Sequence, residues 1–171
     1  LINPLEPKEW SDNASEADAD SPEAFRKSTR LSQHISFLKD FFRVYKDFDD
    51  AQIDALEILL TRLYGKFGIT DNTDYDKLTS DDYPVMADLY AIVESEYQRY
   101  EKGSKSLFTE DLLRELCLGL HSMCVGAESK FFNGHTNIDR SKFLVFCVKG
   151  LDNMAENLRN TLLFSLLSYM S

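Results

Sequence analysis

The sequence contains little cysteine. Cys117, Cys124 and Cys147 are the only three among 171 residues, an odd number with no paired short spacing. Cys117 and Cys124 stand seven residues apart within an apolar helical pattern. In that setting a free cysteine usually acts as a small buried hydrophobic residue. The spacing excludes a zinc knuckle and a redox pair, and it predicts a reducing, cytosolic compartment.

Basic residues are in the minority, and no apolar run is long. Lysine and arginine number 19 against 29 aspartates and glutamates, which gives a formal net charge of -10 at pH 7. Nucleic acids and anionic membranes both attract clustered basic side chains, so this balance argues against either as a direct partner. No run reaches the roughly 18 apolar residues of a membrane-spanning helix, and no signal peptide opens the chain. The composition predicts a soluble globular domain.

Motifs for nucleotide binding and catalysis are missing. The sequence has neither a G-x-x-x-x-G-K-[ST] phosphate loop nor a G-x-G-x-x-G loop. Residues 71–82 fail as a calcium loop because Asp76 stands where the turn needs glycine and Asp82 where glutamate is needed. A hydrolase centred on His135 is an alternative, but no nucleophile or metal set accompanies it. We therefore predict no catalytic residue, no cofactor-binding residue and no metal ligand in this chain.

Apolar residues recur at alternating three- and four-residue steps over much of the chain, which predicts amphipathic helices. Four such helices have apolar stripes wide enough to pack as a small bundle. Helix-capping residues mark where each begins, and glycine-containing breaks mark where two of them end. The predicted starts are Ser21, Asp49 or Asp50, Pro84 and Thr109, and the predicted stops are Gly68 and residues 102–104.

The character of the sequence changes near its C-terminal end. Residues 143–148 contain no polar member, which is typical of a strand buried on both faces. A last helix, starting at Asp152 or Asn153, is apolar on nearly all sides and is expected to be buried. A lone buried strand and an uncapped final helix suggest that both ends of the chain are cut. The predicted fold class is mainly α, a small bundle of about five helices with one short β-strand or hairpin.

Several phrases of the sequence resemble one protein family. Ile2-Asn3-Pro4, residues 63–70, residues 83–90 and the turn at 132–138 are similar to phrases of the conjugative-transfer ATPases of type IV secretion systems. The resemblance is to the largest VirB-class motor ATPase, and in particular to its Gram-positive mobile-element branch. In that family an all-helical subdomain is inserted into a RecA-like motor domain. The resemblance implies three parts: a strand remnant and acidic loop (1–20), the inserted helical subdomain (21–126), and a turn, strand and helix returning to the motor (127–171).

The resemblance also implies a function for the parent protein. The parent would bind ATP with Mg²⁺ through a Walker A loop and hydrolyse it with Walker B carboxylates. Neither motif occurs here, so no catalytic residue transfers to this chain. The segment would serve as a helical coupling or interaction subdomain, with other secretion proteins and further copies of itself as partners. We expect no direct nucleic-acid contact, and a cytoplasmic location at the inner face of the membrane through the secretion complex. The alternative is a stand-alone helical adaptor.

Five residues are candidates for an interface or a structural motif. Asn133, Gly134 and Thr136 match the family turn, where glycine permits a positive φ and the two polar side chains bind loop backbone. We expect a structural role for them, with a contact to nucleotide or to a neighbouring subunit as the alternative. Arg159 is the one basic residue in the last helix, and we favour a surface position over an arginine finger. Lys149, after the predicted strand, has the same two interpretations.

Overall fold

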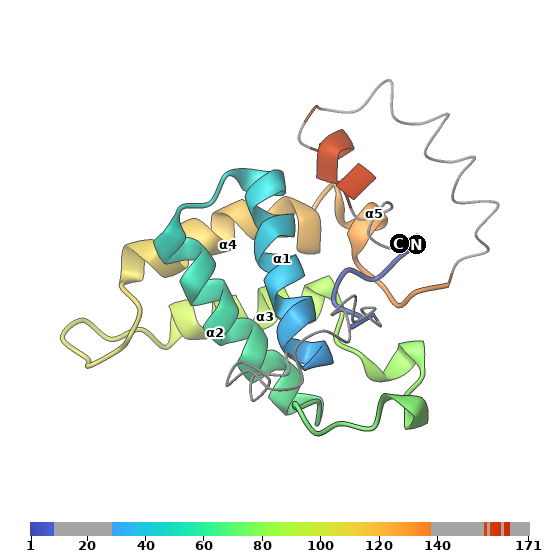
Figure 1. Ribbon diagram of the computed structural model, residues 1–171. Coiled ribbons are helices and arrows are strands. Elements are labelled where there is room, and N and C mark those ends of the chain that lie inside the picture. The colour runs from blue at the N-terminus through green and yellow to red at the C-terminus, as the bar shows by residue number, and fades with distance from the viewer. Residues whose placement is uncertain (9–28, 138–155, 157, 162, 165–171) are drawn as a thin grey trace, which may run out of the picture.

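The computed structural model describes residues 1–8, 29–137, 156, 158–161 and 163–164 (Figure 1). These residues are mainly helical and include no strand, which confirms the predicted α class. The predicted strand at 143–148 lies outside the described residues. Residues 156, 158–161 and 163–164 are helical, within the span of the predicted last helix. The elements are α1 (Arg30–Lys46), α2 (Asp50–Lys66), the 3₁₀ turns η2 (Tyr75–Lys77) and η3 (Ser80–Asp82), α3 (Met86–Gln98), α4 (Glu110–Cys124) and α5 (Ser129–Phe132).

The start of α1 differs from the prediction. The helix begins at Arg30, where the Thr29 hydroxyl accepts a hydrogen bond from the Ser32 amide over 3.1 Å. The predicted start at Ser21 was therefore wrong for this helix, and Ser21 itself lies outside the described residues. The Thr29 hydroxyl also donates to Asp71 over 2.6 Å. The capping residue of α1 therefore also contacts a loop that is distant in the sequence.

The predicted limits of α2 are confirmed. Asp49 and Gln52 form a reciprocal capping box, with side chain to backbone distances of 2.8 and 2.9 Å. The helix ends at Lys66, and Gly68 follows it with a φ of 73°, which lies in the left-handed region. The Thr109 cap of α4 is confirmed in the same way, since its hydroxyl accepts from the Leu112 amide. Local chemistry alone specifies these boundaries.

The core lies between successive helices, because α1 packs on α2, α2 on α3, and α3 on α4. Burying each large apolar side chain contributes about 1.5–3 kcal/mol. Cys117 and Cys124 are free and buried, as predicted. The helical residues near 160 join this core, since the Phe164 ring stacks on Phe37 with centroids 5.4 Å apart. Fully buried members from the four long helices include Phe41, Leu59, Leu60, Leu89, Leu113 and Leu116.

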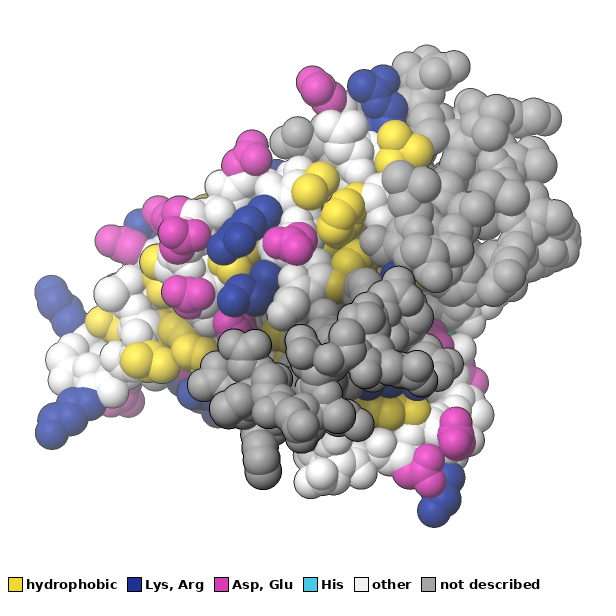
Figure 2. Space-filling view, viewed as in Figure 1, with side chains coloured by type: hydrophobic (Ala, Val, Ile, Leu, Met, Phe, Trp, Pro, Cys, Tyr) yellow, Lys and Arg dark blue, Asp and Glu magenta, His cyan; other side chains and the backbone are white. Residues whose placement is uncertain are grey.

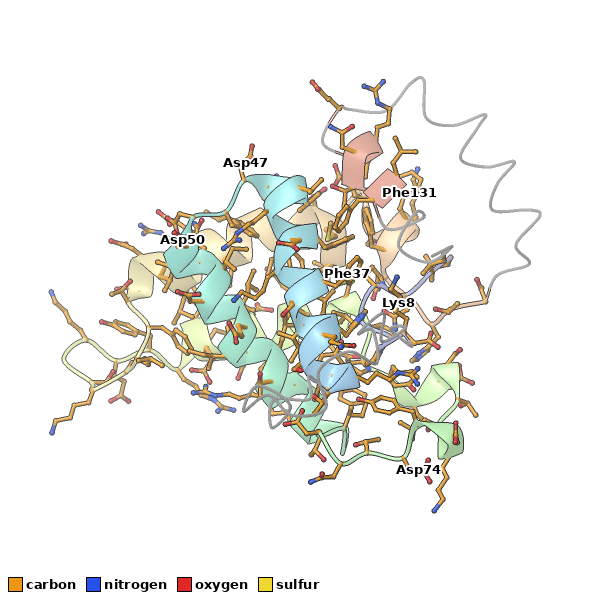
Figure 3. All side chains as sticks on the ribbon, in the orientation of Figure 1. Lys8, Phe37, Asp47, Asp50, Asp74 and Phe131 are labelled. Atoms are coloured by element: carbon orange, nitrogen blue, oxygen red, sulfur yellow. The ribbon has the colours of Figure 1, made fainter. Side chains whose placement is uncertain are left out.

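Charged side chains of both signs are interspersed on the face in Figure 2. Two ion pairs link α1 to α2, Lys39–Glu57 at 2.7 Å and Arg43–Asp50 at 3.2 Å. Asp50 lies beside the turn that joins the two helices (Figure 3). Exposed pairs of this kind contribute about 0–1 kcal/mol each, so they orient the helices more than they stabilise them. Among the described helices, none combines the length and apolar composition that crossing a membrane requires.

Candidate functional site

The N-terminal segment, residues 1–8, folds into a tight turn against the helices. The Glu6 amide donates to the Asn3 carbonyl over 3.2 Å, with Pro4 at the second position, where its fixed φ suits a turn. The Asn3 side-chain oxygen also accepts from the Leu5 amide over 3.1 Å. The Asn3-Pro4 pair therefore shapes this turn through its own backbone and side chain.

Three helical side chains bind the carbonyl groups of this turn. His34 of α1 donates through Nε2 to the Pro4 carbonyl over 2.8 Å, and the Tyr64 hydroxyl of α2 donates to the Leu5 carbonyl over 2.5 Å. The Arg30 guanidinium donates to the Pro7 carbonyl, with its nearer nitrogen at 2.7 Å. Lys8 extends over the Phe37 ring at 5.7 Å (Figure 3). The segment is thus attached to both α1 and α2.

Asn3 connects this segment to two others that are distant in the sequence. Its side chain donates to the Pro84 carbonyl over 2.8 Å, just before α3, and its backbone amide donates to the Thr136 hydroxyl over 2.9 Å. Asn3 is 2% exposed, so these bonds take the place of hydrogen bonds to water. We call the contact between residues 1–8, 79–87 and 133–137 the junction.

The predicted turn residues Asn133, Gly134 and Thr136 all lie in the junction. Asn133 accepts a hydrogen bond from the Ala87 amide over 2.9 Å, which satisfies one of the free amides in the first turn of α3. The Asn137 amide donates to the Leu1 carbonyl over 3.2 Å. The segment before α1 and the segment after α5 therefore contact each other. Figure 1 shows residues 1–8 beside α5. Asn133 and Thr136 therefore form hydrogen bonds within this chain, and Gly134 lies between them.

Burial controls the charge state of two helical side chains that bind the N-terminal segment, His34 and Tyr64. His34 is 2% exposed, and burial lowers its pKa to about 4, although the bond to the Pro4 carbonyl opposes the shift. The positive charges of Lys8 and Arg30 lower the pKa further. At neutral pH His34 is uncharged and carries its proton on Nε2, because the carbonyl can only accept. Burial also raises the pKa of Tyr64 well above its usual value, so its hydroxyl remains a donor.

The sequence did not indicate the roles of His34, Tyr64 and Arg30. Each of these side chains donates to a backbone carbonyl. Every residue has such a carbonyl, so the sequence does not show which one is the acceptor. Of the remaining predicted residues, Arg159 is helical and half-buried, and Lys149 lies outside the described residues. No described group of three or more His, Cys, Asp or Glu side chains is arranged to hold a metal ion.

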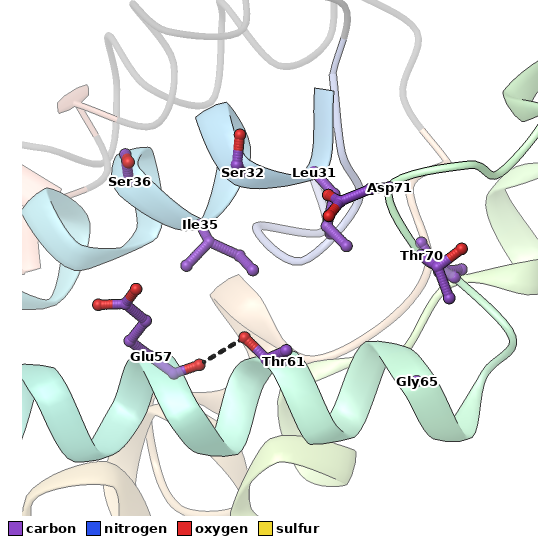
Figure 4. Close-up of a pocket in the computed structure, with 10 residues that line it drawn as sticks. Leu31, Ser32, Ile35, Ser36, Glu57, Thr61, Gly65, Thr70 and Asp71 are labelled. Carbon is purple, nitrogen blue, oxygen red and sulfur yellow. Dashed lines mark hydrogen bonds between the residues drawn. The ribbon is translucent and has the colours of Figure 1, made fainter. Parts of the chain in front are cut away.

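A groove of about 480 Å³ runs between α1 and α2 and ends at the loop after α2 (Figure 4). Its walls mix apolar groups with hydroxyls, and the Thr61 hydroxyl donates to the Glu57 carbonyl over 2.9 Å. The Glu57 carboxylate is paired with Lys39. The residues that line the groove are Leu31, Ser32, Ile35, Ser36, Glu57, Thr61, Gly65, Ile69, Thr70 and Asp71. This set offers contact surface but no nucleophile paired with a base.

Substituting Gly134 with alanine should destabilise the chain by about 1–3 kcal/mol. Gly134 has a φ of 146°, and a Cβ placed there would lie 2.5 Å from a Leu1 methyl carbon. Gly65→Ala is the matched control, because this helical position has open space around it and should gain about 0.5–1 kcal/mol. Urea denaturation of both variants measures the difference. Equal free energies of unfolding for the two variants would contradict the prediction that the backbone at Gly134 disfavours alanine.

Comparison with known proteins gives a likeness of fold to a solved structure. The sequence matches no protein-family model and no curated protein. Its structure is similar to the solved structure of VirB4 of Thermoanaerobacter pseudethanolicus, with a TM-score of 0.77 and 22% sequence identity. The alignment covers 99% of this chain and 56% of that one, so this chain spans little more than half of the solved VirB4 chain. The chain therefore has the fold of a substantial part of a VirB4 protein.

Proposed function

We propose that this chain is a helical coupling subdomain of a VirB4-like motor ATPase of a type IV secretion system. The likeness of fold to a VirB4 structure supports the assignment. The phrases quoted from the sequence point to the Gram-positive mobile-element branch, and hence to conjugative DNA transfer. In this proposal the motor that binds ATP and Mg²⁺ is another part of the same protein. The subdomain acts in the cytoplasm and reaches the membrane through its partners.

The observation that carries the coupling role is the junction. The segments before α1 and after α5 are bonded to each other, and both are bonded to the start of α3. A displacement of either segment therefore acts on the helices through a small set of short hydrogen bonds. The Asn3–Pro84 bond is buried, and the bonds at Thr136 and Asn133 are partly buried. Breaking a buried bond leaves an unsatisfied group, which resists rearrangement. This connection would transmit motion from a motor domain to a surface that contacts other secretion proteins.

Thr136→Val in the protein that carries this chain tests the coupling. Valine has the same shape but cannot accept the hydrogen bond from the Asn3 amide. We expect substrate transfer to fall by at least tenfold while ATP hydrolysis stays within twofold of wild type. Thr61→Val is the control, since this exposed hydroxyl bonds only within α2. If Thr136→Val left transfer unchanged, the junction would have no coupling role.

A stand-alone helical adaptor is the competing function, and the source gene distinguishes the two. Under our proposal the reading frame encodes a Walker A loop before this segment and a Walker B strand, ending in acidic residues, after it. An adaptor would have neither. Finding a complete reading frame without these motifs would reject the motor assignment and favour the adaptor.

A further inference from the structure

The α3–α4 loop, residues 99–109, extends away from the packed helices (Figure 1). Both of its ends are attached to the core, because Tyr100 packs against the buried residues and Phe108 is itself buried. Between these two anchors, a backbone hydrogen bond of 2.9 Å closes a turn at residues 101–104. Gly103 in this turn has a φ of 90°, which is a left-handed value. The loop therefore presents a defined turn at a projecting end of the molecule.

The loop concentrates basic side chains that have no partner in this chain. Arg99, Lys102 and Lys105 are exposed, and none of them takes part in an ion pair or a ring contact with the described residues. The loop has a single acidic residue, Glu101, whereas the whole chain has a formal net charge of -10. By contrast, the basic side chains that pair with a carboxylate are Lys39, Arg43, Arg62, Lys77 and Arg114.

Leu107 adds an apolar group beside these basic side chains. Its side chain is 72% exposed, although the next residue in the sequence is the buried Phe108. The Ser106 hydroxyl accepts a hydrogen bond from the Phe108 amide over 3.2 Å, which restrains the backbone on both sides of Leu107. A single exposed leucine is common on protein surfaces and indicates little alone. Together with the unpaired basic side chains, it fits a partner that carries both negative charge and an apolar side chain.

The charge of the remaining surface limits the size of this partner. Nucleic acids and anionic membranes carry negative charge over a long distance, so they would also face the acidic remainder of the chain. Exposed charges separated by more than about 8 Å are largely screened at physiological ionic strength. A short acidic segment bound at the loop therefore avoids most of the repulsion that a long polyanion would meet.

We propose that the α3–α4 loop binds a short acidic segment of another protein. Arg99, Lys102 and Lys105 contact its carboxylates, and Leu107 contacts an apolar side chain of the same segment. Complementary exposed charges contribute more to the rate of association and to the choice of partner than to affinity. The footprint is smaller than a standard stable interface, so the contact is weak and transient. This inference goes beyond the proposed secretion function, because it applies equally to a motor subdomain and to an adaptor.

Fluorescence anisotropy of a labelled peptide tests the proposal. The probe is a short peptide of aspartates with interspersed leucines, and its control has asparagine in place of each aspartate. We expect this chain to bind the acidic probe, with an affinity that falls as salt is added, and to bind the control about tenfold more weakly.

Two double variants with the same change of net charge locate the binding site. Lys102→Glu with Lys105→Glu should raise the Kd of the acidic probe by about tenfold. Lys66→Glu with Lys130→Glu alters two exposed side chains outside the loop and should raise it by less than about twofold. Equal effects of the two double variants would show that only net charge matters and would overturn the proposal. Absence of probe binding to the wild-type chain would overturn it as well.

Leu107 has a matched control in Leu118 of α4, which is also 72% exposed. Leu107→Ser should raise the Kd of the acidic probe by about threefold, because part of a leucine side chain loses its apolar contact. Leu118→Ser should leave the Kd unchanged, and equal effects of the two would overturn the assigned contact at Leu107. Tighter binding of single-stranded DNA or of phosphatidylglycerol vesicles than of the peptide, lost in Lys102→Glu with Lys105→Glu, would overturn the choice of a protein segment.

Discussion

Asn3→Ala should lower the free energy of unfolding by about 2–4 kcal/mol. The substitution removes the donor to the Pro84 carbonyl and the acceptor for the Leu5 amide. Asn3 is 2% exposed, so water does not readily replace either bond. Each buried polar group left without a partner costs about 1–3 kcal/mol, which is a large share of the total stability of a typical domain. The change is measured from the midpoint and slope of urea denaturation.

Asn72→Ala is the matched control for this measurement. Asn72 is exposed in the loop after α2, and its loss should change stability by no more than about 0.5 kcal/mol. A substitution at Asn3 with an equally small effect would mean that the junction does not restrain the N-terminal segment. That result would also weaken the proposed coupling role, which depends on the same bonds.

The stability of the chain should depend on pH through His34. Its pKa is about 4 in the folded chain, against an ordinary value of 6.5. Between these values the unfolded chain binds more protons than the folded chain, so stability rises with pH across this interval. The contribution is fully present above pH 6.5 and is lost as the pH falls toward 4. The expected loss between pH 7.5 and 4.5 is about 2–3 kcal/mol.

His34→Gln separates this effect from the titration of carboxylates. Glutamine retains an N–H donor for the Pro4 carbonyl but does not titrate. The pH dependence of the variant should be flatter than that of the wild type by the same 2–3 kcal/mol, which follows from the pKa shift. Parallel slopes for the two proteins between pH 7.5 and 4.5 would show that His34 is not held in its neutral form.

Local sequence signals predicted several boundaries correctly. Asp49 and Gln52 lie within one helical turn of each other, so their reciprocal hydrogen bonds can be inferred from residue type and spacing. The same holds for the cap at Thr109 and for the left-handed glycine at Gly68. In each case the interacting groups are neighbours in the chain, and their geometry does not depend on the rest of the fold.

The start of α1 shows where local signals are insufficient. Ser21 and Thr29 are both suitable capping residues, and the sequence around Ser21 includes a proline at the following position. Thr29 is the residue that caps α1, and its hydroxyl also bonds to Asp71 in the loop after α2. Residue type and spacing alone did not distinguish between these two residues.

By itself, the sequence determined the helical class, the helix boundaries set by local capping, and the burial of the two described cysteines. Only the tertiary structure placed Asn3 against Pro84 and Thr136, and His34 against Pro4. The reason is physical. A capping bond joins groups a few residues apart, whereas the bond between Asn3 and Thr136 joins residues 133 positions apart. Such a contact exists only after the helices between them have packed.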